Sequence, residues 1–274
     1  MHKAKIFKIL MNIAGILLSL IVLIPFYFVL INAFKSKADA ADMSLSISKH
    51  LEGFNNFETV LKEGNILNAM LNSTVVTCAS VILIIILSAM IGFIIERRRS
   101  KLSSIINTLI FIGIVVPVSI VPIYKLLQIF NMVSTFHGVI LLYTATGIPM
   151  SVLIYKGFYK TIPRELDEAG IIDGCSNIRL FFSIIFPLLK TVTITVLVIQ
   201  FLSVWNDLQF VLYFLNTSKR FTLPLTIYFF TSQYNSSWNL VFADVVIIAL
   251  PVVILYAIAQ KYIIAGMTSG AIKG

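Results

Sequence analysis

Long apolar runs without charged residues dominate the chain, and the polar residues gather in short segments between them. A helix that crosses the hydrocarbon core of a bilayer needs roughly 20 predominantly apolar residues. The runs therefore predict six membrane spans, at about 9–31, 67–95, 102–125, 139–156, 190–213 and 240–262. We expect an all-α, polytopic membrane protein with a single transmembrane domain over residues 1–274.

The first run has an alternative interpretation as a secretory signal peptide. Lys3, Lys5 and Lys8 precede the run, and Ala38-Asp39-Ala40 resembles a cleavage site. However, the run is longer than the roughly 7–15 apolar residues of a signal peptide, and the candidate cleavage site lies well beyond its end. A retained span is therefore favoured.

Composition and charge extend this picture. Hydrophobic residues make up 58% of the chain, charged residues only 12%, and the mean hydropathy is +0.96. Six spans place both termini on one side, and most of the 21 Lys and Arg residues fall on that side. Because cytoplasmic loops carry an excess of Lys and Arg, both termini are expected in the cytoplasm. This asymmetry also accounts for the net charge of +9, so no nucleic-acid partner is expected.

The segments outside the spans are too short to form a soluble catalytic domain. They are the external loops 32–66 and 214–239, the cytoplasmic loop 157–189 and the cytoplasmic tail 263–274. The sequence has no G-x-x-x-x-G-K-[ST], G-x-S-x-G or H-E-x-x-H motif. The three histidines lie far apart and show no metal-ligand spacing. We therefore expect no catalytic residue, no metal site and no cofactor bound by this chain.

Two carboxylates fall within the predicted spans: Asp207 near the outer end of the fifth, and Asp244 about one turn inside the outer end of the sixth. An acid in a membrane is costly and is by default a functional candidate. The alternative is that both lie at the headgroup boundary, hydrated or capping a loop. Prolines could also break the spans and free backbone groups to line a cavity, although proline is common in membrane helices. They are Pro117, Pro122, Pro149 and Pro251.

One cytoplasmic segment, 165–175, holds four acids in a chain that otherwise avoids charge. Thr161 and Pro163 predict a helix start just before it. The acids of the first turn then lie near the positive end of the helix dipole, which stabilises them. Further along, the sequence predicts a helix end at Gly174, a second short helix capped by Ser176, and a turn into the fifth span at Pro187.

One face of the first short helix holds four residues at i, i+3, i+4 and i+7 spacing: Leu166, Ala169, Gly170 and Asp173. Of these, Ala169 and Gly170 are small. Small side chains let another backbone approach closely, so this face is expected to fit a groove in a partner protein. The alternative is a segment that rests on lipid headgroups. Interfacial helices favour Lys and Arg on their polar face, whereas this helix is acidic, which favours the protein partner.

The segment resembles the EAA loop of permease subunits of binding-protein-dependent ABC importers. The family pattern is E-A-A, three residues, G, nine residues, I, one residue, L-P. Here it reads Glu168-Ala169-Gly170, then Gly174, Ile184 and Phe186-Pro187, with Gly170 in place of alanine and Phe186 in place of leucine. Glycine there costs up to about 1 kcal/mol of helix stability relative to alanine. The C-terminal stretch 266–274, GMTSGAIKG, resembles the tail of the MalG-like branch, the permeases of sugar importers.

The resemblance implies a type I ABC importer permease fold in the bacterial or archaeal cytoplasmic membrane. It implies that the loop docks on a cytoplasmic ATPase that holds ATP and Mg²⁺, through Glu168, Ala169, Gly170, Asp173, Gly174, Arg179 and Pro187. The tail would add contacts at Gly270, Lys273 and Gly274. Besides the lipid bilayer, the implied partners are a second homologous permease, two ATPase copies and an extracytoplasmic sugar-binding protein. The candidates for lining the solute pathway are Trp205, Asn206, Asp207, Gln209 and Asp244.

Three alternatives stay open from the sequence. The first keeps the importer role but changes the cargo to a sugar phosphate or polyol. The second is a secondary transporter driven by an ion gradient, in which Asp207 and Asp244 would be the coupling carboxylates. The third is a membrane-embedded enzyme or assembly protein, which the missing catalytic motifs disfavour.

Overall fold

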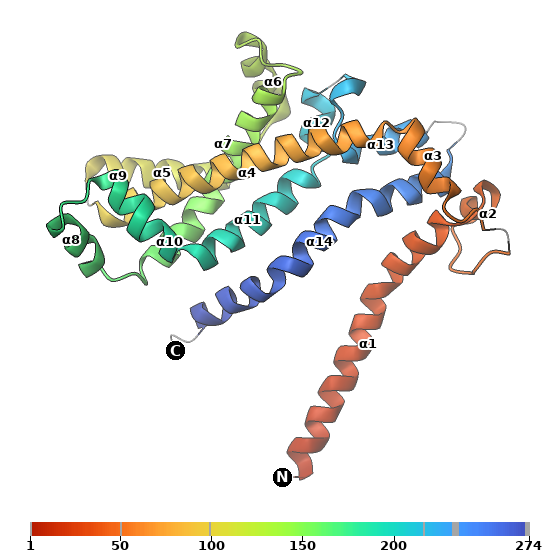
Figure 1. Ribbon diagram of the computed structural model, residues 1–274, viewed down its shortest axis with the longest axis horizontal. Helices are drawn as coiled ribbons and strands as arrows, with labels where there is room; N and C mark the ends of the chain where they lie inside the picture. Colours follow the sequence, from red (N-terminus) through yellow and green to blue (C-terminus); the bar gives the residue numbers. More distant parts are fainter. Residues whose placement is uncertain (1, 50, 99, 216, 232–235, 272–274) are drawn as a thin grey trace. The chain divides into compact units, whose positions relative to one another are not determined.

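The computed structural model describes residues 2–49, 51–98, 100–215, 217–231 and 236–271, and these residues form helices and connecting turns with no strand (Figure 1). The all-α prediction is confirmed. The helices divide into two compact units. Unit 1 comprises Met1–Asn68 and Leu225–Leu250, and unit 2 comprises Ala69–Pro224 and Pro251–Gly274.

Unit 1 contains buried polar side chains that bond to backbone groups and to one another. Its elements are α1 (His2–Ala33), α2 (Lys37–Ala41), α3 (Asn55–Glu63), most of α13 (Leu223–Phe230) and the first part of α14 (Trp238–Ala271). Lys35 is buried, and its Nζ donates to the carbonyl oxygen of Ser44 at 2.7 Å. The Asn56 amide donates to the Ala33 carbonyl oxygen at 2.9 Å and accepts from Asn239 at 2.7 Å. Burying these side chains costs little free energy because each of them makes a hydrogen bond.

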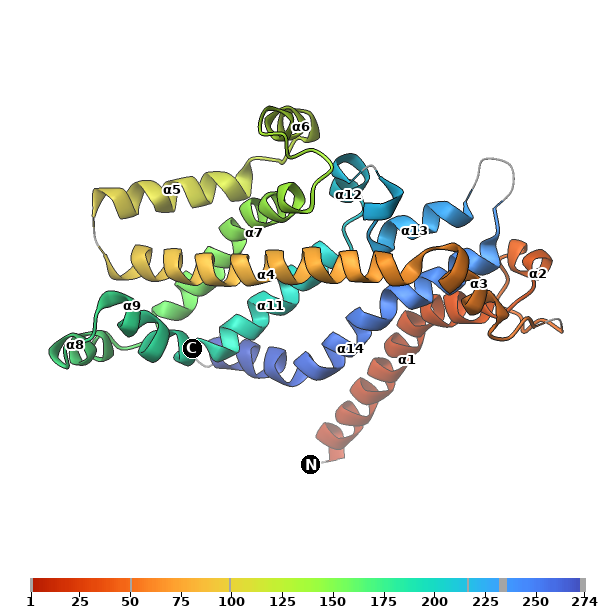
Figure 2. The same ribbon diagram turned by 45° about the horizontal axis from the view of Figure 1, so that its top comes forward.

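Unit 2 contains the remaining helices (Figure 2). They are nearly all of α4 (Ile66–Arg97), then α5 (Lys101–Val115), α6 (Ile120–Ile129), α7 (Phe136–Tyr159), α8 (Glu165–Ile172), α9 (Asn177–Arg179), α10 (Phe186–Leu188), α11 (Lys190–Trp205), α12 (Gln209–Phe214) and the last part of α14. Its core joins α4, α7 and α11 to the segment between α9 and α10. The core residues are Val81, Ile85, Ala89, Tyr155, Tyr159, Ile162, Leu180, Phe181, Ile185, Leu189, Val192 and Val196.

Helix α7 runs through the middle of unit 2 because small residues let its neighbours approach. A Cβ atom on Gly147 would lie 2.6 Å from Ile84 Cδ1 and 2.8 Å from Gln200 Oε1, so a side chain there would displace both neighbours. Gln200 in turn donates to Ser151 Oγ at 2.9 Å, which ties α11 to α7. At the other end of α7, the Tyr159 hydroxyl donates to a backbone carbonyl of α4 at 2.9 Å.

Among the described residues, four helices are long and apolar enough to cross a membrane: Phe7–Ala33, Ile66–Arg97, Phe136–Tyr159 and Trp238–Gln260. They coincide with the predicted first, second, fourth and sixth spans. A fifth candidate is a bent pair, Asn177–Leu188 with Lys190–Trp205, whose two arms meet at 81°.

The predicted third span, 102–125, is not one helix. Helix α5 ends at Val115, and α6 begins at Ile120. Val116 is extended (φ −75°, ψ 120°), as expected for a residue before proline, and Pro117 has no N–H to continue the helix. Each of the two helices alone is shorter than the roughly 20 residues that a span requires.

The predicted fifth span, 190–213, is also interrupted, and the predicted tail is helical. Helix α11 ends at Trp205, and the side chains of Asn206 and Asp207 bond backbone groups at the break before α12. Short polar side chains compete for backbone bonds in this way and favour turns. Residues 263–271 continue α14, because isolated glycines weaken a helix without ending it.

Candidate functional site

The acidic segment 165–175 forms a short helix, as the sequence predicted. Helix α8 begins at Glu165, and its first turn contains Glu165, Asp167 and Glu168. No side chain caps this helix start. The three carboxylates lie where the unpaired backbone N–H groups carry partial positive charge, which stabilises the helix by a few tenths to about 1 kcal/mol for each charge.

The end of α8 requires a glycine. Gly174 has φ +78°, in the left-handed region that side chains disfavour. Its N–H donates to the Ile171 carbonyl at 3.0 Å, and the Cys175 N–H donates to the Gly170 carbonyl at 3.0 Å. This pair of bonds is a Schellman end, which satisfies the last carbonyls of the helix. The predicted stop at Gly174 is confirmed.

The chain then turns into the fifth apolar segment through an irregular helix. Ser176 caps α9 by accepting the Arg179 N–H at 3.4 Å, as the sequence predicted. A π-helical segment, Leu180–Ile185, follows and leads directly into α10. Pro187 is exposed in α10, just before the chain bends by 81° into α11, so the predicted turn is present.

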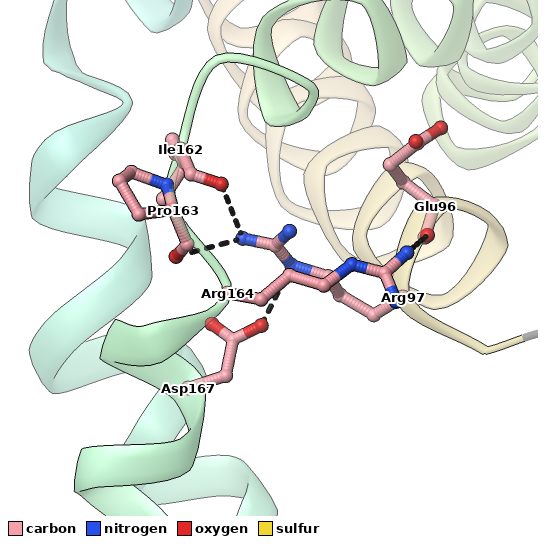
Figure 3. A network of polar contacts seen from close by, with 6 residues as sticks. All are labelled: Glu96, Arg97, Ile162, Pro163, Arg164 and Asp167. Carbon is pink, nitrogen blue, oxygen red and sulfur yellow. Dashed lines mark hydrogen bonds and ion pairs between the residues drawn. The ribbon is translucent and has the colours of Figure 1, made fainter.

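Two arginines join this segment to the end of α4 (Figure 3). Arg97 Nε lies 2.7 Å from Asp167 Oδ2, and the two side chains are only 10% and 14% exposed. The same guanidinium donates to the Ile162 carbonyl at 3.0 Å. In the opposite direction, Arg164 donates to the Glu96 carbonyl at 3.3 Å. Arg97 reaches from α4 to α8, and Arg164, directly before α8, reaches back to α4. The two arginines therefore anchor α8 to α4.

The Arg97–Asp167 pair is expensive to break. Burial raises the pKa of the Asp167 carboxyl above its ordinary value, and the nearby charges of Arg97 and Arg164 offset only part of that effect. Removing one member of a buried pair typically costs about 3–5 kcal/mol, because the other charge is left without compensation. The pair therefore fixes the position of α8.

Gly170 serves packing within the chain, which differs from the predicted contact with a partner. It is buried, and a Cβ atom there would lie 2.6 Å from Leu180 Cδ1 and 3.1 Å from Ile184 Cδ1. Spacing alone placed Gly170 on the same face as Ala169, but α8 turns Gly170 and Asp167 inward. The glycine in place of the family's alanine lets α8 lie closely against the π-helical segment.

Several other residues of α8 and of its C-terminal end are open to solvent. Glu168, Ala169, Asp173 and Gly174 are exposed, and Ile172 is 84% exposed. Arg179 is exposed on the next helix. An acidic rim around an apolar side chain can bind a surface that is basic and apolar. The accessible part of the segment therefore contains five residues that the sequence predicted as contacts: Glu168, Ala169, Asp173, Gly174 and Arg179.

The pathway candidates near Asp207 cluster at the break between α11 and α12. Trp205 is buried and stacks on Phe201, with ring centroids 5.2 Å apart. Asp207 Oδ2 accepts the Tyr143 hydroxyl at 2.7 Å and the Phe210 N–H at 2.8 Å. The carboxylate therefore caps α12, which matches the alternative of a loop-capping role. Asn206 and Gln209 are exposed beside it.

Asp244 belongs to unit 1 and is fully buried, so it is not a hydrated carboxylate. The Thr226 hydroxyl donates to its Oδ2 at 2.8 Å, while Oδ1 has no hydrogen-bond partner among the described residues. Of the tail candidates, Gly270 lies in α14, whereas Lys273 and Gly274 lie outside the described residues. Within the described ranges, no group of three or more His, Cys, Asp or Glu could hold a metal ion.

Sequence reasoning missed the Arg97–Asp167 pair. The available signal was charge: a run of arginines ends the second apolar segment, and an acidic helix lies on the same predicted side of the membrane. That signal places opposite charges at one level, but it does not identify which acid meets which arginine.

Comparison with known proteins gives matches along the whole chain. Residues 88–269 match the family described as "Binding-protein-dependent transport system inner membrane component". The "Probable starch degradation products transport system permease protein AmyC" of Thermoanaerobacterium thermosulfurigenes is 36% identical, and the alignment covers 100% of both chains. The "Melibiose/raffinose/stachyose import permease protein MelC" of Bacillus subtilis (strain 168) is also 36% identical, over 92% of this chain and 91% of the relative.

A solved structure is similar as well. A chain in the crystal structure of a bacterial ABC transporter involved in the import of the acidic polysaccharide alginate superimposes with a TM-score of 0.81. The match covers 94% of this chain and 96% of that chain, at 17% sequence identity. At this identity the likeness concerns the fold alone.

Proposed function

Because the chain belongs to the family of binding-protein-dependent transport system inner membrane components, we propose that it is the permease subunit of an ATP-driven importer for a sugar or oligosaccharide. The names of its relatives support this cargo: one concerns starch degradation products, another melibiose, raffinose and stachyose. The observation that carries the mechanism is the anchored acidic helix α8, fixed on one side and open on the other.

In this proposal α8 is a coupling helix that docks on a separate cytoplasmic ATPase. Exposed Glu168 pairs with a basic residue of that subunit, while Ala169 and Ile172 face its apolar surface. ATP and Mg²⁺ are held by the ATPase, and this chain contributes no residue to hydrolysis. Closure of two ATPase copies moves α8, and the movement reaches the membrane helices as a rigid-body displacement.

Two connections inside unit 2 support this transmission. The first runs from Asp167 through Arg97 into α4, over contacts that are largely buried. The second runs from Gly170 to Leu180 in the π-helical segment, then through α10 to the 81° bend before α11. Closely packed contacts pass on a displacement because interiors have low compressibility.

The rest of the assembly follows from the same proposal. The chain lies in the cytoplasmic membrane with both termini in the cytoplasm, beside a second homologous permease. A sugar-binding protein meets the external loops, and the polar residues at the α11–α12 break, Asn206 and Gln209, face the solute pathway. Asp207 positions that break through its bonds to Tyr143 and the Phe210 backbone.

Charge reversal at Glu168 tests the coupling role. Glu168→Arg is expected to abolish co-purification of the ATPase and ATP-dependent sugar uptake into proteoliposomes, because like charges then meet at the docking surface. Glu52→Arg, an equal reversal at an exposed acid of the predicted external loop, is the matched control for assembly and is expected to leave co-purification of the ATPase unchanged. Normal assembly and uptake in Glu168→Arg would refute the docking role.

The same proteoliposomes separate the rival functions. An ATP-driven permease keeps uptake when ion gradients are collapsed, and it loses uptake when ATP is omitted. Uptake that follows the ion gradient and disappears in Asp207→Asn or Asp244→Asn would identify a secondary transporter instead. Competition of labelled sugar uptake by sugar phosphates and polyols assigns the cargo.

A further inference from the structure

Two hollows meet at the end of unit 2 that carries α8. One, of about 430 Å³, lies between α4 and the α8–α9 segment and has mainly apolar walls, including Met90, Phe93, Ile94 and Phe182. The other, of about 400 Å³, lies between the α4–α5 turn and α7 and has polar walls, including Ser100, Ser104, Asn107 and Lys156. Both are lined by Arg98 and Arg164. The two arginines therefore stand where an apolar space joins a polar one.

The shared arginines have hydrogen-bond donors to spare. Arg164 uses one guanidinium nitrogen on the Glu96 carbonyl, at 3.3 Å (Figure 3). Arg98 is exposed, and its side chain makes no hydrogen bond or ion pair with the residues that the structure describes. A guanidinium carries five N–H donors in a planar fork that fits phosphate oxygens. By contrast, Arg97 is occupied by Asp167 and the Ile162 carbonyl.

The polar hollow adds positive charge and hydroxyl groups beside these arginines. Lys156 donates to Asn107 Oδ1 at 2.8 Å and lies over the Phe111 ring, so its ammonium group is held in place. One acid lines each hollow: Glu96 lines the polar hollow, and Glu168 lines the apolar hollow. With Asp167 neutralised by Arg97, three cations remain against these two acids. The balance at the junction favours an anion.

A small soluble anion would not account for the apolar walls. Met90, Phe93 and Ile94 lie on the last turns of a helix long enough to cross a membrane, so the apolar hollow opens where that helix leaves the hydrocarbon region. A phosphate alone would leave these side chains against water, which is unfavourable in proportion to their apolar area. An amphiphile fills both spaces at once, and basic pockets between membrane helices bind anionic lipid headgroups.

We propose that the two hollows form one site for a single anionic phospholipid. Arg98 and Arg164 bind its phosphate, the hydroxyl-lined hollow takes the rest of the headgroup, and the first acyl carbons lie against Phe93 and Phe182. The inference rests on the proposed orientation, which places this end of unit 2 at the cytoplasmic leaflet. Because Asp167 and Glu168 belong to the same wall, the bound lipid braces α8 in its anchored position.

Native mass spectrometry of the full-length chain, purified with the subunits that accompany it, tests the site directly. After titration with phosphatidylglycerol, the wild type is expected to retain one tightly bound lipid. Removing one guanidinium group is expected to weaken lipid binding about fivefold, at about 1 kcal/mol for each basic residue. The double variant Arg98→Gln and Arg164→Gln should therefore bind the lipid roughly 25-fold more weakly. Lys101→Gln, which removes a charge at the same end of α5 without lining either hollow, is the matched control and retains the lipid.

A second variant covers the case in which the double substitution misfolds. Ile94→Trp fills the apolar hollow while both guanidinium groups stay in place, and it is expected to lose the lipid too. Equal retention of phosphatidylcholine by the wild type, displacement of the lipid by inorganic phosphate, or full retention by either variant would overturn the inference. Retention is counted whether or not an ATPase is bound, so a failed docking role and a failed lipid site are separate results.

Discussion

The Arg97–Asp167 pair gives a prediction with an asymmetric outcome. If Asp167 becomes Asn, Arg97 stays charged and largely buried without a counter-ion, because a guanidinium does not lose its proton in proteins. If Arg97 becomes Gln, the isolated Asp167 can take up a proton and become neutral. We therefore expect Asp167→Asn to free α8 more than Arg97→Gln does.

The structure sets the magnitudes. Breaking a buried pair costs about 3–5 kcal/mol. Arg97 keeps its bond to the Ile162 carbonyl and some exposure, so about 3 kcal/mol is expected for Asp167→Asn. For Arg97→Gln the expected loss is about 1–3 kcal/mol, the range for an unsatisfied buried polar group. The double variant should lose at least about 1 kcal/mol less than the sum of the singles, because the two residues are in contact.

The two single variants also differ in their pH dependence. Burial raises the folded-state pKa of Asp167 above its unfolded value, and removing Arg97 takes away a charge that lowers it. The folded state then binds the proton more tightly than the unfolded state, so stability rises as the pH falls through the folded-state pKa. The loss in Arg97→Gln should shrink as the pH falls through that raised pKa, whereas Asp167→Asn has no carboxyl at this position and its opening free energy should not follow this titration.

Hydrogen exchange of the α8 amides measures these losses as local opening free energies, after correction for the intrinsic exchange rate at each pH. Glu165→Gln, at an exposed acid in the same turn, is the control and should change the opening free energy by no more than about 1 kcal/mol. Additive effects in the double variant, or a pH-independent loss in Arg97→Gln, would refute the assignment of the pair as the anchor.

Three further predictions concern single positions. Gly174→Ala forces a side chain into the left-handed region and should open the α8 end by about 1–2 kcal/mol, measured as faster exchange at Cys175; an unchanged rate would contradict the Schellman end. Tyr143→Phe removes a hydrogen bond to the Asp207 carboxylate and should lower the free energy of unfolding by about 1.5–3 kcal/mol in denaturant titrations of the purified protein. An unchanged free energy of unfolding would contradict the capping role of Asp207. Asp244→Asn should be tolerated in thermal unfolding because an amide keeps the bond from Thr226, whereas Asp244→Lys should abolish folding; equal behaviour would show that the site is not closed.

The local chemistry of the segment from Glu165 to Pro187 was predictable because each signal acts over a few residues. Acids in a first turn, a glycine at a left-handed end and a serine cap all work through neighbouring backbone groups, and all three are in place. The Arg97–Asp167 contact joins residues 70 positions apart, and its partners were not fixed by any local rule. Helical spacing showed which residues share a face of α8, but not that Gly170 is on the buried side.

The spans were predictable as apolar runs but not as continuous helices. Proline illustrates the reason. Pro149 and Pro251 lie inside long helices, whereas the chain breaks at Pro117. All three remove one backbone donor, so the difference comes from whether neighbouring groups and packing satisfy the carbonyl that is left free. The sequence shows that proline lacks a backbone donor, but it does not show which other group bonds the carbonyl that is left free.

The π-helical turn between α9 and α10 makes the relative orientation of the helices on its two sides depend on the number of residues in this segment. A π-helix accommodates an additional residue per turn relative to an α-helix. Deleting one residue from Leu180–Ile185 would relax the turn to ordinary α geometry and leave the helices on its two sides in nearly the same register. An insertion that the π turn does not absorb would instead rotate everything beyond it by about 100° around the axis. Pro187 and the start of α11 would then point away from the side on which α8 now lies. The segment from Gly174 to Pro187 should therefore tolerate this single deletion and lose coupling on a single insertion, even when every original side chain is kept.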